Sequence, residues 1–170
     1  MTDERNAEPG GTAQTSFILE RESLMSRTHH LSRGGVAVGT LRLDGWSRGA
    51  TAAVGGETWN VETTGFFRQR TTVSSQTGTV LAQMRGKDAE VVGAPPLRWV
   101  TLRFGGLWGF TRPDGSVIAQ FSRLKGFTGR TMEIETMSGN AQVDLVCAVL
   151  GGLFLIRQAQ AAASTAAASS

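Results

Sequence analysis

The stretch at residues 143–158, VDLVCAVLGGLFLIRQ, decides the fold, because it is the only long apolar run in the 170-residue chain. Its apolar part, residues 143–156, is 14 residues long and is interrupted by Asp144 and by two glycines. A helix needs about 20 apolar residues to cross the roughly 30 Å of hydrocarbon in a bilayer, whereas buried core helices are commonly shorter. The length therefore predicts a core helix, with a membrane tail anchor as the alternative.

The apolar side chains of this run would cover the whole circumference of a helix rather than one stripe. They are Leu145, Val146, Val149, Leu150, Leu153, Phe154, Leu155 and Ile156. A helix that is apolar on every side is enclosed by the rest of its protein. Gly151 and Gly152 each lower helix propensity by roughly 1 kcal/mol relative to alanine, so we expect a strand wall to approach the helix closely there.

The rest of the chain consists of strand-length segments separated by turn pairs such as Gly-Gly and Asp-Gly. The alternation of apolar and polar residues is clean at 59–62, 80–85 and 132–135, and less clean at 36–43, 66–74, 97–104, 107–112 and 117–124. Proline cannot donate to a strand ladder, so we place Pro95 and Pro96 in a loop or at an edge. We count eight to eleven strands in hairpins, which predicts an antiparallel barrel or sandwich, and a closed barrel has room for the helix.

The domain organisation follows from these patterns. We expect a disordered N-terminal tail at 1–14, one barrel domain at 15–157 with its central helix at about 141–157, and a low-complexity Ala/Ser tail at 158–170. Cys147 is the only cysteine, which excludes an internal disulfide, and the acidic N-terminus lacks the apolar segment of a secretory signal. We therefore expect a cytoplasmic monomer, with attachment to the inner membrane surface left open.

The charge distribution suggests an anionic partner. From residue 23 onward the chain has 15 basic and 9 acidic side chains, a net charge of +6. A protein of this charge is attracted to phosphate groups of lipids or nucleic acids and to small anions. The alternative is that a coding bias makes arginine the ordinary solubilising residue, because the chain has 15 Arg and only 2 Lys.

Two groups of basic residues are the candidate binding sites. Arg68 and Arg70 would share one strand face, with Arg85 and Lys87 in the segment that pairs beside them. Such a group suits phosphate, since arginine offers bidentate geometry and lysine a point charge. The second candidate group is Arg123 and Lys125, together with Arg130. Arginine on an outer strand face that only solubilises the protein remains the alternative.

No motif predicts catalysis, and we expect no cofactor or metal. The G-x-S-x-G match at residues 45–49 would make Ser47 a nucleophile, but both histidines precede it, unlike in the hydrolases that use this motif. His29 and His30 lack a third ligand, so we expect a solvated loop pair. We expect Cys147 to be an inert apolar residue. Motifs that read nucleic acid are absent, so we do not expect nucleic-acid binding.

Two segments resemble the Tubby C-terminal-like superfamily, which includes the LURP-one-related and phospholipid scramblase-like proteins. Residues 56–86, GETWNVETTGFFRQRTTVSSQTGTVLAQMRG, are similar to the family's strand pattern with a basic strand and a G-x-V/L-A return, and residues 108–121, WGFTRPDGSVIAQF, to its aromatic strand and Asp-Gly turn. The resemblance covers about residues 16–157. It implies a closed barrel of about twelve strands around a C-terminal helix, and binding to membrane surfaces or phosphoinositides. The calcium-ligand cluster proposed for scramblases has no counterpart here, so scrambling is not implied.

These observations lead to one expected fold and two functional hypotheses. We predict a mainly β protein, a closed antiparallel barrel of about 10–12 strands that encloses one hydrophobic C-terminal α-helix. The first hypothesis is a non-catalytic barrel that binds anionic phospholipid headgroups, or a protein partner, through a basic face. The second is a small-molecule carrier or enzyme with a pocket at the barrel rim, which we rank lower because a helix inside the barrel would leave little empty interior.

Overall fold

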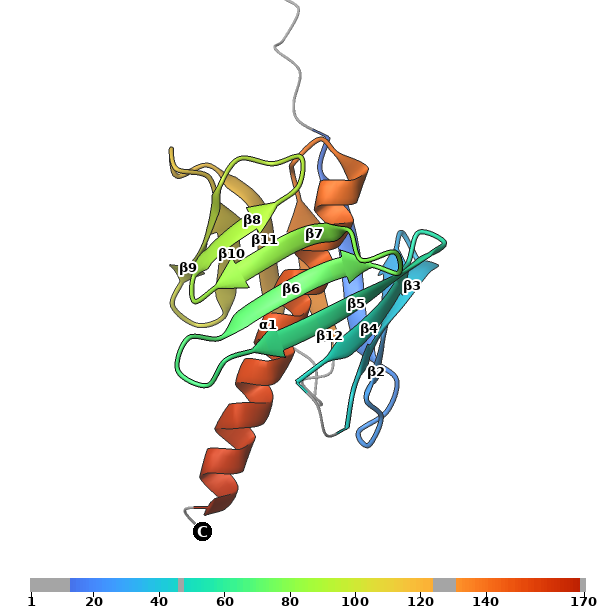
Figure 1. Ribbon diagram of the computed structural model, residues 1–170, viewed down its shortest axis with the longest axis vertical. Coiled ribbons are helices and arrows are strands. Elements are labelled where there is room, and N and C mark those ends of the chain that lie inside the picture. The colour runs from blue at the N-terminus through green and yellow to red at the C-terminus, as the bar shows by residue number, and fades with distance from the viewer. Residues whose placement is uncertain (1–12, 46–47, 124–130, 169–170) are drawn as a thin grey trace, which may run out of the picture.

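A closed antiparallel barrel surrounds one C-terminal helix (Figure 1). The computed structural model describes residues 13–45, 48–123 and 131–168. In these residues there are twelve strands and one helix: β1 (Thr15–Arg21), β2 (Thr28–Arg33), β3 (Val36–Leu43), β4 (Ala50–Val54), β5 (Glu57–Thr64), β6 (Arg70–Ser75), β7 (Val80–Arg85), β8 (Asp88–Val91), β9 (Leu97–Arg103), β10 (Leu107–Thr111), β11 (Val117–Arg123), β12 (Thr131–Thr136) and α1 (Ala141–Ala168). Each strand pairs with the next, and β12 pairs with β1, which confirms the predicted fold class.

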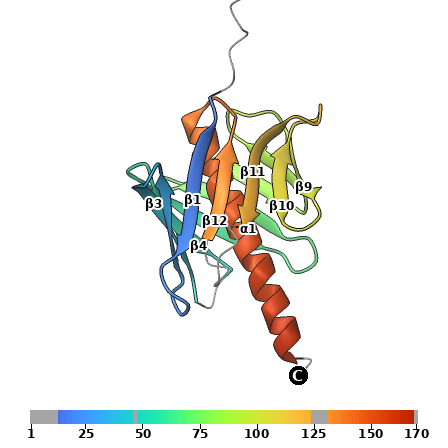
Figure 2. The same cartoon turned by 180° about the vertical axis from the view of Figure 1, so that it is seen from behind.

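The two ends of the barrel differ in their relation to the helix. Since neighbouring strands are antiparallel, the turns after even-numbered strands and the β12–α1 connection lie at one end, the helix-start end, and the turns after odd-numbered strands lie at the other, the helix-exit end. The described turns of the helix-exit end are 22–27, 44–45 with 48–49, 65–69, 86–87 and 104–106. Helix α1 runs through the barrel and leaves it at this end, as Figures 1 and 2 show.

The core consists of inward-facing strand residues that pack around the first half of the helix. Buried residues of α1 are Val143, Asp144, Val146 to Leu153, and Leu155. The largest contacts are aromatic: the Trp99 ring lies 4.9 Å from Phe110, 5.2 Å from Phe121 and 5.1 Å from Phe154 of the helix. Strand and helix side chains therefore form one continuous core, and the helix is enclosed as the apolar pattern predicts.

The two helix glycines lie where the barrel wall comes closest. A Cβ atom on Gly151 would lie 2.7 and 2.8 Å from Cε1 and Cε2 of Phe121, and one on Gly152 would lie 2.8 Å from Cδ2 of Leu19. Real Cβ atoms essentially never approach other atoms to less than 3.0 Å. The close approach expected from the sequence is therefore present, and it compensates for the low helix propensity of glycine.

The helix begins with a defined N-cap. The Oδ1 atom of Asn140 accepts hydrogen bonds from the backbone N–H groups of Gln142 (3.0 Å) and Val143 (3.2 Å). The buried Asp144 accepts further hydrogen bonds from the Ser138 hydroxyl (2.5 Å) and the Ser138 backbone N–H (3.2 Å). The two Asn140 contacts satisfy helix N–H groups that have no partner within the helix, and the Asp144 contacts tie the preceding turn to the first turn of the helix.

We expect Asn140→Ala to lower the free energy of unfolding by about 1 kcal/mol, because alanine cannot accept the two cap hydrogen bonds. Urea denaturation followed by circular dichroism measures the difference. Asn140→Ser is the matched control, since serine can still cap and should be nearly neutral. Equal destabilisation by the two substitutions would contradict the cap.

The helix is longer than the expected 141–157, and this changes the argument about membrane crossing. It continues to Ala168, because the alanine-rich residues 158–168 have high helix propensity. With 28 residues, α1 is long and apolar enough to cross a membrane by length and composition alone. The argument that the segment is too short was therefore wrong. Burial, and not length, distinguishes α1 from a membrane-spanning helix, because half of its most apolar 18-residue window is buried inside the barrel.

Strands β1, β2, β4 and β8 were not among the predicted segments, and the predicted strand at 66–74 is displaced. Strand β6 begins only at Arg70, and residues 65–69 form the turn before it. Gly65 has a φ of 87°, and a Cβ there would lie 2.5 Å from the carbonyl oxygen of Arg68. Only glycine allows this tight turn, which takes Arg68 off the strand. Pro95 and Pro96 lie in a loop, as predicted.

Candidate functional site

A large pocket opens at the helix-exit end, between α1 and the turns that follow β3 and β5. Its volume is about 1160 Å³, so the expectation that the helix leaves little empty interior was wrong at this end. Among its described lining residues are six arginines and one carboxylate: Arg27, Arg48, Arg68, Arg70, Arg85, Arg157 and Asp44. Apolar side chains also line it: Leu43, Phe66, Phe67, Met84, Leu150, Leu153 and Phe154. The pocket is thus both cationic and apolar.

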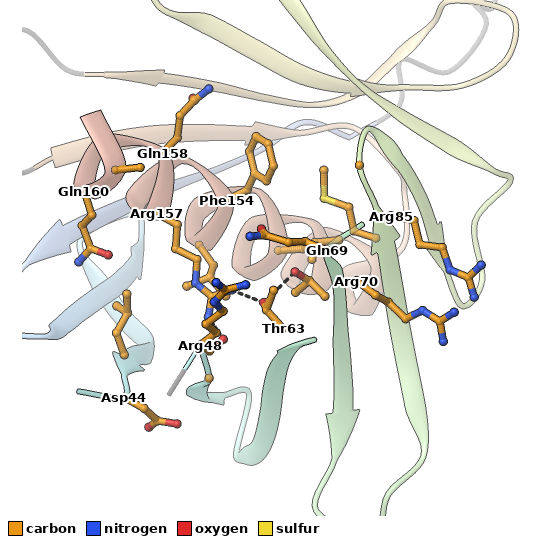
Figure 3. Close-up of a pocket in the computed structure, with 18 of the residues that line it drawn as sticks. Asp44, Arg48, Thr63, Gln69, Arg70, Arg85, Phe154, Arg157, Gln158 and Gln160 are labelled. Carbon is orange, nitrogen blue, oxygen red and sulfur yellow. Dashed lines mark hydrogen bonds between the residues drawn. The ribbon is translucent and has the colours of Figure 1, made fainter. Parts of the chain in front are cut away.

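Arg157 holds the helix to the mouth of the pocket. It follows the apolar run of α1 and is half-buried. Its guanidinium donates hydrogen bonds to the Thr63 hydroxyl of β5 and to the backbone carbonyl of Arg48 (Figure 3). The Thr63 hydroxyl is also 2.9 Å from that of Thr71 on β6. One arginine therefore links the helix, the β3–β4 turn and the wall formed by β5 and β6.

Arg48 lies next to Arg157 and contacts the β5–β6 turn. Its Nη1 donates a 3.0 Å hydrogen bond to the carbonyl oxygen of Gly65, and its guanidinium carbon lies 5.7 Å from the centre of the Phe66 ring. A guanidinium over an aromatic face is attracted by the ring electrons. These contacts fix Arg48 at the pocket mouth beside an exposed aromatic side chain.

The electrostatics of this pair favour an anion. Burial is the largest cause that lowers the pKa of Arg157, the neighbouring Arg48 lowers it further, and the Asp44 carboxylate opposes both. Arg157 nevertheless stays charged, because an arginine side chain does not lose its proton in proteins. Two adjacent guanidinium groups repel each other, so an anion between them would remove an unfavourable interaction as well as add a favourable one. The mouth of the pocket is thus suited to bind negative charge.

The sequence-predicted residues of the first group come together only in part. Arg70 and Arg85 are direct cross-strand partners. Both line the pocket, but Figure 3 shows their guanidinium groups directed away from the helix, at the outer edge of the mouth. Arg68 also lines the pocket, from the β5–β6 turn rather than from the predicted strand face. Lys87 is exposed in the β7–β8 turn and is not among the lining residues.

The second predicted group is mostly outside the described part of the chain. Arg123 is the last residue of β11. Lys125 and Arg130 lie outside the described residues, as does Ser47 of the G-x-S-x-G match. Anion binding by this second group therefore stays a prediction.

Three pocket arginines were missed by sequence reasoning: Arg27, Arg48 and Arg157. Arg48 and Arg157 are 109 residues apart in the chain, and only the closed barrel brings them together. Arg157 did give a local signal, because it is the first charged residue after the apolar run. At the end of a buried helix, such a residue lies where the helix emerges from the core.

His29 faces a second, smaller cavity, and the expectation of a solvated loop pair was wrong. Both histidines are in β2, where alternation buries His29 and exposes His30. The cavity is about 220 Å³ and is lined by His29, Arg21 and helix residues that include Leu155 and Ile156. Burial, and secondly Arg21, lower the pKa of His29 to about 4. Its Nδ1 atom has no hydrogen-bond partner among the described residues. The imidazole is therefore neutral at pH 7.

The other reactive side chains of the described chain offer no further constellation. Cys147 is buried, and burial raises the pKa of its thiol to about 12, so it is an inert core residue. Residues 13–45, 48–123 and 131–168 contain no group of three His, Cys, Asp or Glu side chains that could hold a metal ion. Glu135 accepts a hydrogen bond from Gln120 on the neighbouring strand.

Comparisons with protein-family models, with curated proteins and with solved structures found no match to this chain. The Tubby-like resemblance thus stays a prediction from the sequence.

Proposed function

We propose that this protein is a non-catalytic barrel that binds an anionic phospholipid headgroup at the helix-exit pocket. One observation carries the proposal: the pocket combines six arginines and one carboxylate with an apolar floor. A phosphate group would lie at the mouth near Arg48 and Arg157. The adjoining hydrocarbon would contact the apolar side chains of the helix.

The chemistry of arginine supports phosphate as the bound group. A guanidinium presents up to five N–H donors in a plane and binds phosphate oxygens two at a time. The contacts of Arg157 with Thr63 and the Arg48 carbonyl orient its guanidinium before a ligand arrives. A preoriented donor loses less conformational freedom on binding than a free surface arginine.

The apolar floor favours a lipid over a fully polar anion. Leu150, Leu153 and Phe154 of the helix and Met84 of β7 line the same pocket. Contact with hydrocarbon removes such surface from water and contributes roughly 25 cal/mol per Å². The Tubby-like resemblance implies the same class of ligand, and it would place the protein in the cytoplasm at the inner membrane surface.

The first experiment titrates the protein with a short-chain phosphatidylglycerol below its micelle concentration, by calorimetry. We expect saturable binding, and at least tenfold weaker binding by the double variant Arg48→Gln, Arg157→Gln, since a charge-assisted hydrogen bond to phosphate contributes about 1.5–3 kcal/mol. The matched control is Arg33→Gln, Arg98→Gln, which removes the same charge from exposed positions near the helix-start end.

Three further measurements sharpen this result. Arg157→Lys keeps the charge but loses the bidentate geometry, so its affinity should lie between those of the wild type and the double variant. Circular dichroism verifies that each variant is folded. Equal affinity for short-chain phosphatidylcholine, or equal loss in both double variants, would contradict the proposal.

The same pocket also suits the second hypothesis, a small-molecule carrier or enzyme with a rim pocket, because its volume of about 1160 Å³ is close to the upper end of the range of small-molecule sites. Glycerophosphoglycerol, the headgroup without acyl chains, separates the two functions. We expect it to bind much more weakly than the short-chain lipid. Equal affinity would favour the soluble ligand.

A further inference from the structure

The four most exposed large apolar side chains of the described residues lie at the helix-exit end. In the described chain, the most exposed are Phe104 (99 %), Phe67 (94 %), Met25 (92 %) and Phe66 (78 %), followed by three valines and Leu24 (57 %). All three phenylalanines, Met25 and Leu24 lie in turns of the helix-exit end. Single exposed apolar residues are ordinary, but several apolar side chains at the tips of turns on one end of a barrel indicate an interaction surface.

These side chains are spaced around the mouth of the barrel. Leu24 and Met25 are in the β1–β2 turn, Phe66 and Phe67 in the β5–β6 turn, and Phe104 in the β9–β10 turn. In the closed order of twelve strands described above, these three hairpins are separated by equal intervals of one hairpin. Three apolar tips around a ring define a plane across the barrel end. A flat partner can contact all three at once, whereas a small globular partner would reach one or two.

Basic residues lie between and beside the apolar tips. Arg48 and Lys87 are in the β3–β4 and β7–β8 turns, which alternate with the apolar hairpins. Arg68 follows Phe67, and Arg103 precedes Phe104, and all four cations are exposed. Alternating apolar tips and cations complement the surface of an anionic bilayer, where hydrocarbon lies just beneath a layer of phosphates.

The helix continues beyond this plane without a charge. Its segment 158–168, QAQAAASTAAA, is mostly exposed and extends past the strands (Figures 1 and 2). Gln158, Gln160 and Ala161 still line the pocket, so residues 162–168 are the part that projects beyond it. At 1.5 Å per residue this part is about 10 Å long, within the depth of one leaflet, or half of roughly 30 Å of hydrocarbon. Before its last turn, the backbone hydrogen bonds of this segment are made within the helix, so an uncharged helical segment can enter hydrocarbon.

We propose that the helix-exit end docks on an anionic bilayer, with the three apolar turn tips and the helix segment 162–168 inserted into one leaflet. This proposal rests on the proposed function, which supplies the bound headgroup. It adds which face of the protein docks and how the protein is oriented on the bilayer. In this orientation the pocket mouth faces the lipid phosphates, and the helix-start end faces water. The enclosed half of α1 stays in the barrel, so the protein enters one leaflet without crossing the membrane.

The central test is flotation with phosphatidylcholine vesicles, with and without phosphatidylglycerol. We expect the triple variant Leu24→Ser, Met25→Ser, Phe104→Ser, at exposed positions that do not line the pocket, to lose roughly tenfold or more of its partitioning into anionic vesicles. The matched control is Val36→Ser, Val80→Ser, Val92→Ser, which removes three exposed apolar side chains from the helix-start end. It should partition like the wild type. Equal partitioning of both triple variants would overturn the docking face.

Insertion depth has its own readout. Phe104→Cys and Val92→Cys each add one exposed thiol, while Cys147 is buried and does not label. With a fluorophore on that thiol, we expect lipids brominated on their acyl chains to quench the label at position 104 and not at position 92. Equal quenching at both positions, or at neither, would contradict the orientation.

The helix segment is tested by adding charge. Ala162→Glu with Ala167→Glu should weaken vesicle binding several-fold, because carboxylates in hydrocarbon are costly. The control Ala162→Gln, Ala167→Gln has the same shape without the charge and should bind more tightly than the glutamate variant. Equal binding would remove the helix segment from the proposal.

The outcomes separate docking from headgroup binding. If the triple variant Leu24→Ser, Met25→Ser, Phe104→Ser binds short-chain phosphatidylglycerol normally but no longer binds vesicles, both proposals stand. If it keeps its vesicle binding while Arg48→Gln, Arg157→Gln loses the short-chain lipid, the pocket stands and the docking face is overturned. If this triple variant loses vesicle binding but the wild type binds no short-chain lipid, the pocket function fails alone. A dimer in solution that this triple variant disperses would assign these side chains to a second copy of the chain and overturn the docking proposal.

Discussion

Replacing Gly151 by leucine is expected to lower the free energy of unfolding by about 3 kcal/mol, the upper part of the usual range for an overpacked core. A side chain at this position meets the Phe121 ring, which is fully buried and lies 5.2 Å from Trp99 and 5.9 Å from Phe110. The ring cannot move without displacing its aromatic neighbours. The gain of about 1 kcal/mol in helix propensity offsets only part of the cost.

Gly152 is the matched control for this prediction. A Cβ there meets only Cδ2 of Leu19, the far end of a flexible side chain. Gly152→Ala should therefore change stability by less than about 1 kcal/mol, since the strain and the gain in helix propensity oppose each other. Urea denaturation of Gly151→Leu, Gly151→Ala and Gly152→Ala gives the order of stability. If Gly152→Ala is as destabilising as Gly151→Leu, the described packing of α1 against β11 is wrong.

The second large effect is a loss of stability in mild acid, caused by His29. Its pKa is lowered from 6.5 to about 4, chiefly by burial. The unfolded chain therefore binds a proton at this residue more readily than the native protein does. Stability is fully present above about pH 6.5 and falls as the pH drops toward 4, with a total loss on the order of 3 kcal/mol. The cavity around His29 has no carboxylate among its described lining residues that could stabilise the charged imidazole.

Urea denaturation at a series of pH values between 4 and 7 tests this prediction. His29→Gln should remove most of the pH dependence in this range, because glutamine does not titrate. A wild-type protein that is equally stable at pH 4.5 and 7 would contradict a buried, neutral His29.

The fold could be predicted to a large extent because the helix carries most of the information. An apolar segment without a polar stripe requires a wall on every side, and hairpin-rich sequence provides that wall. Two of the four missed strands, β4 and β2, can be explained by the residues at their inward positions. Strand β4 buries Ala50, Ala52 and Val54 against the core, and such small residues do not form a recognisable strand pattern. In β2 one of the two inward positions is occupied by a polar residue, His29, and the other by Leu31.

The site was less predictable, since it depends on tertiary geometry. Arg70 and Arg85 could be paired from the hairpin pattern, and the structure gives them as direct partners. Their outward direction at the rim could not be derived, because it depends on the register of β6 and on where the preceding turn ends. The pocket itself arises where the helix no longer fills the barrel mouth, and this gap has no signature in the sequence.

Hydrogen–deuterium exchange with and without anionic vesicles tests the central claim most directly, because it locates the lipid-facing end without any substitution. The account predicts slower exchange in peptides that contain the 65–69 turn and the helix segment 162–168. It predicts no change in the helix-start turns at 34–35, 55–56 and 112–116. Protection confined to the helix-start turns, or no protection anywhere while the protein is bound to vesicles, would contradict it.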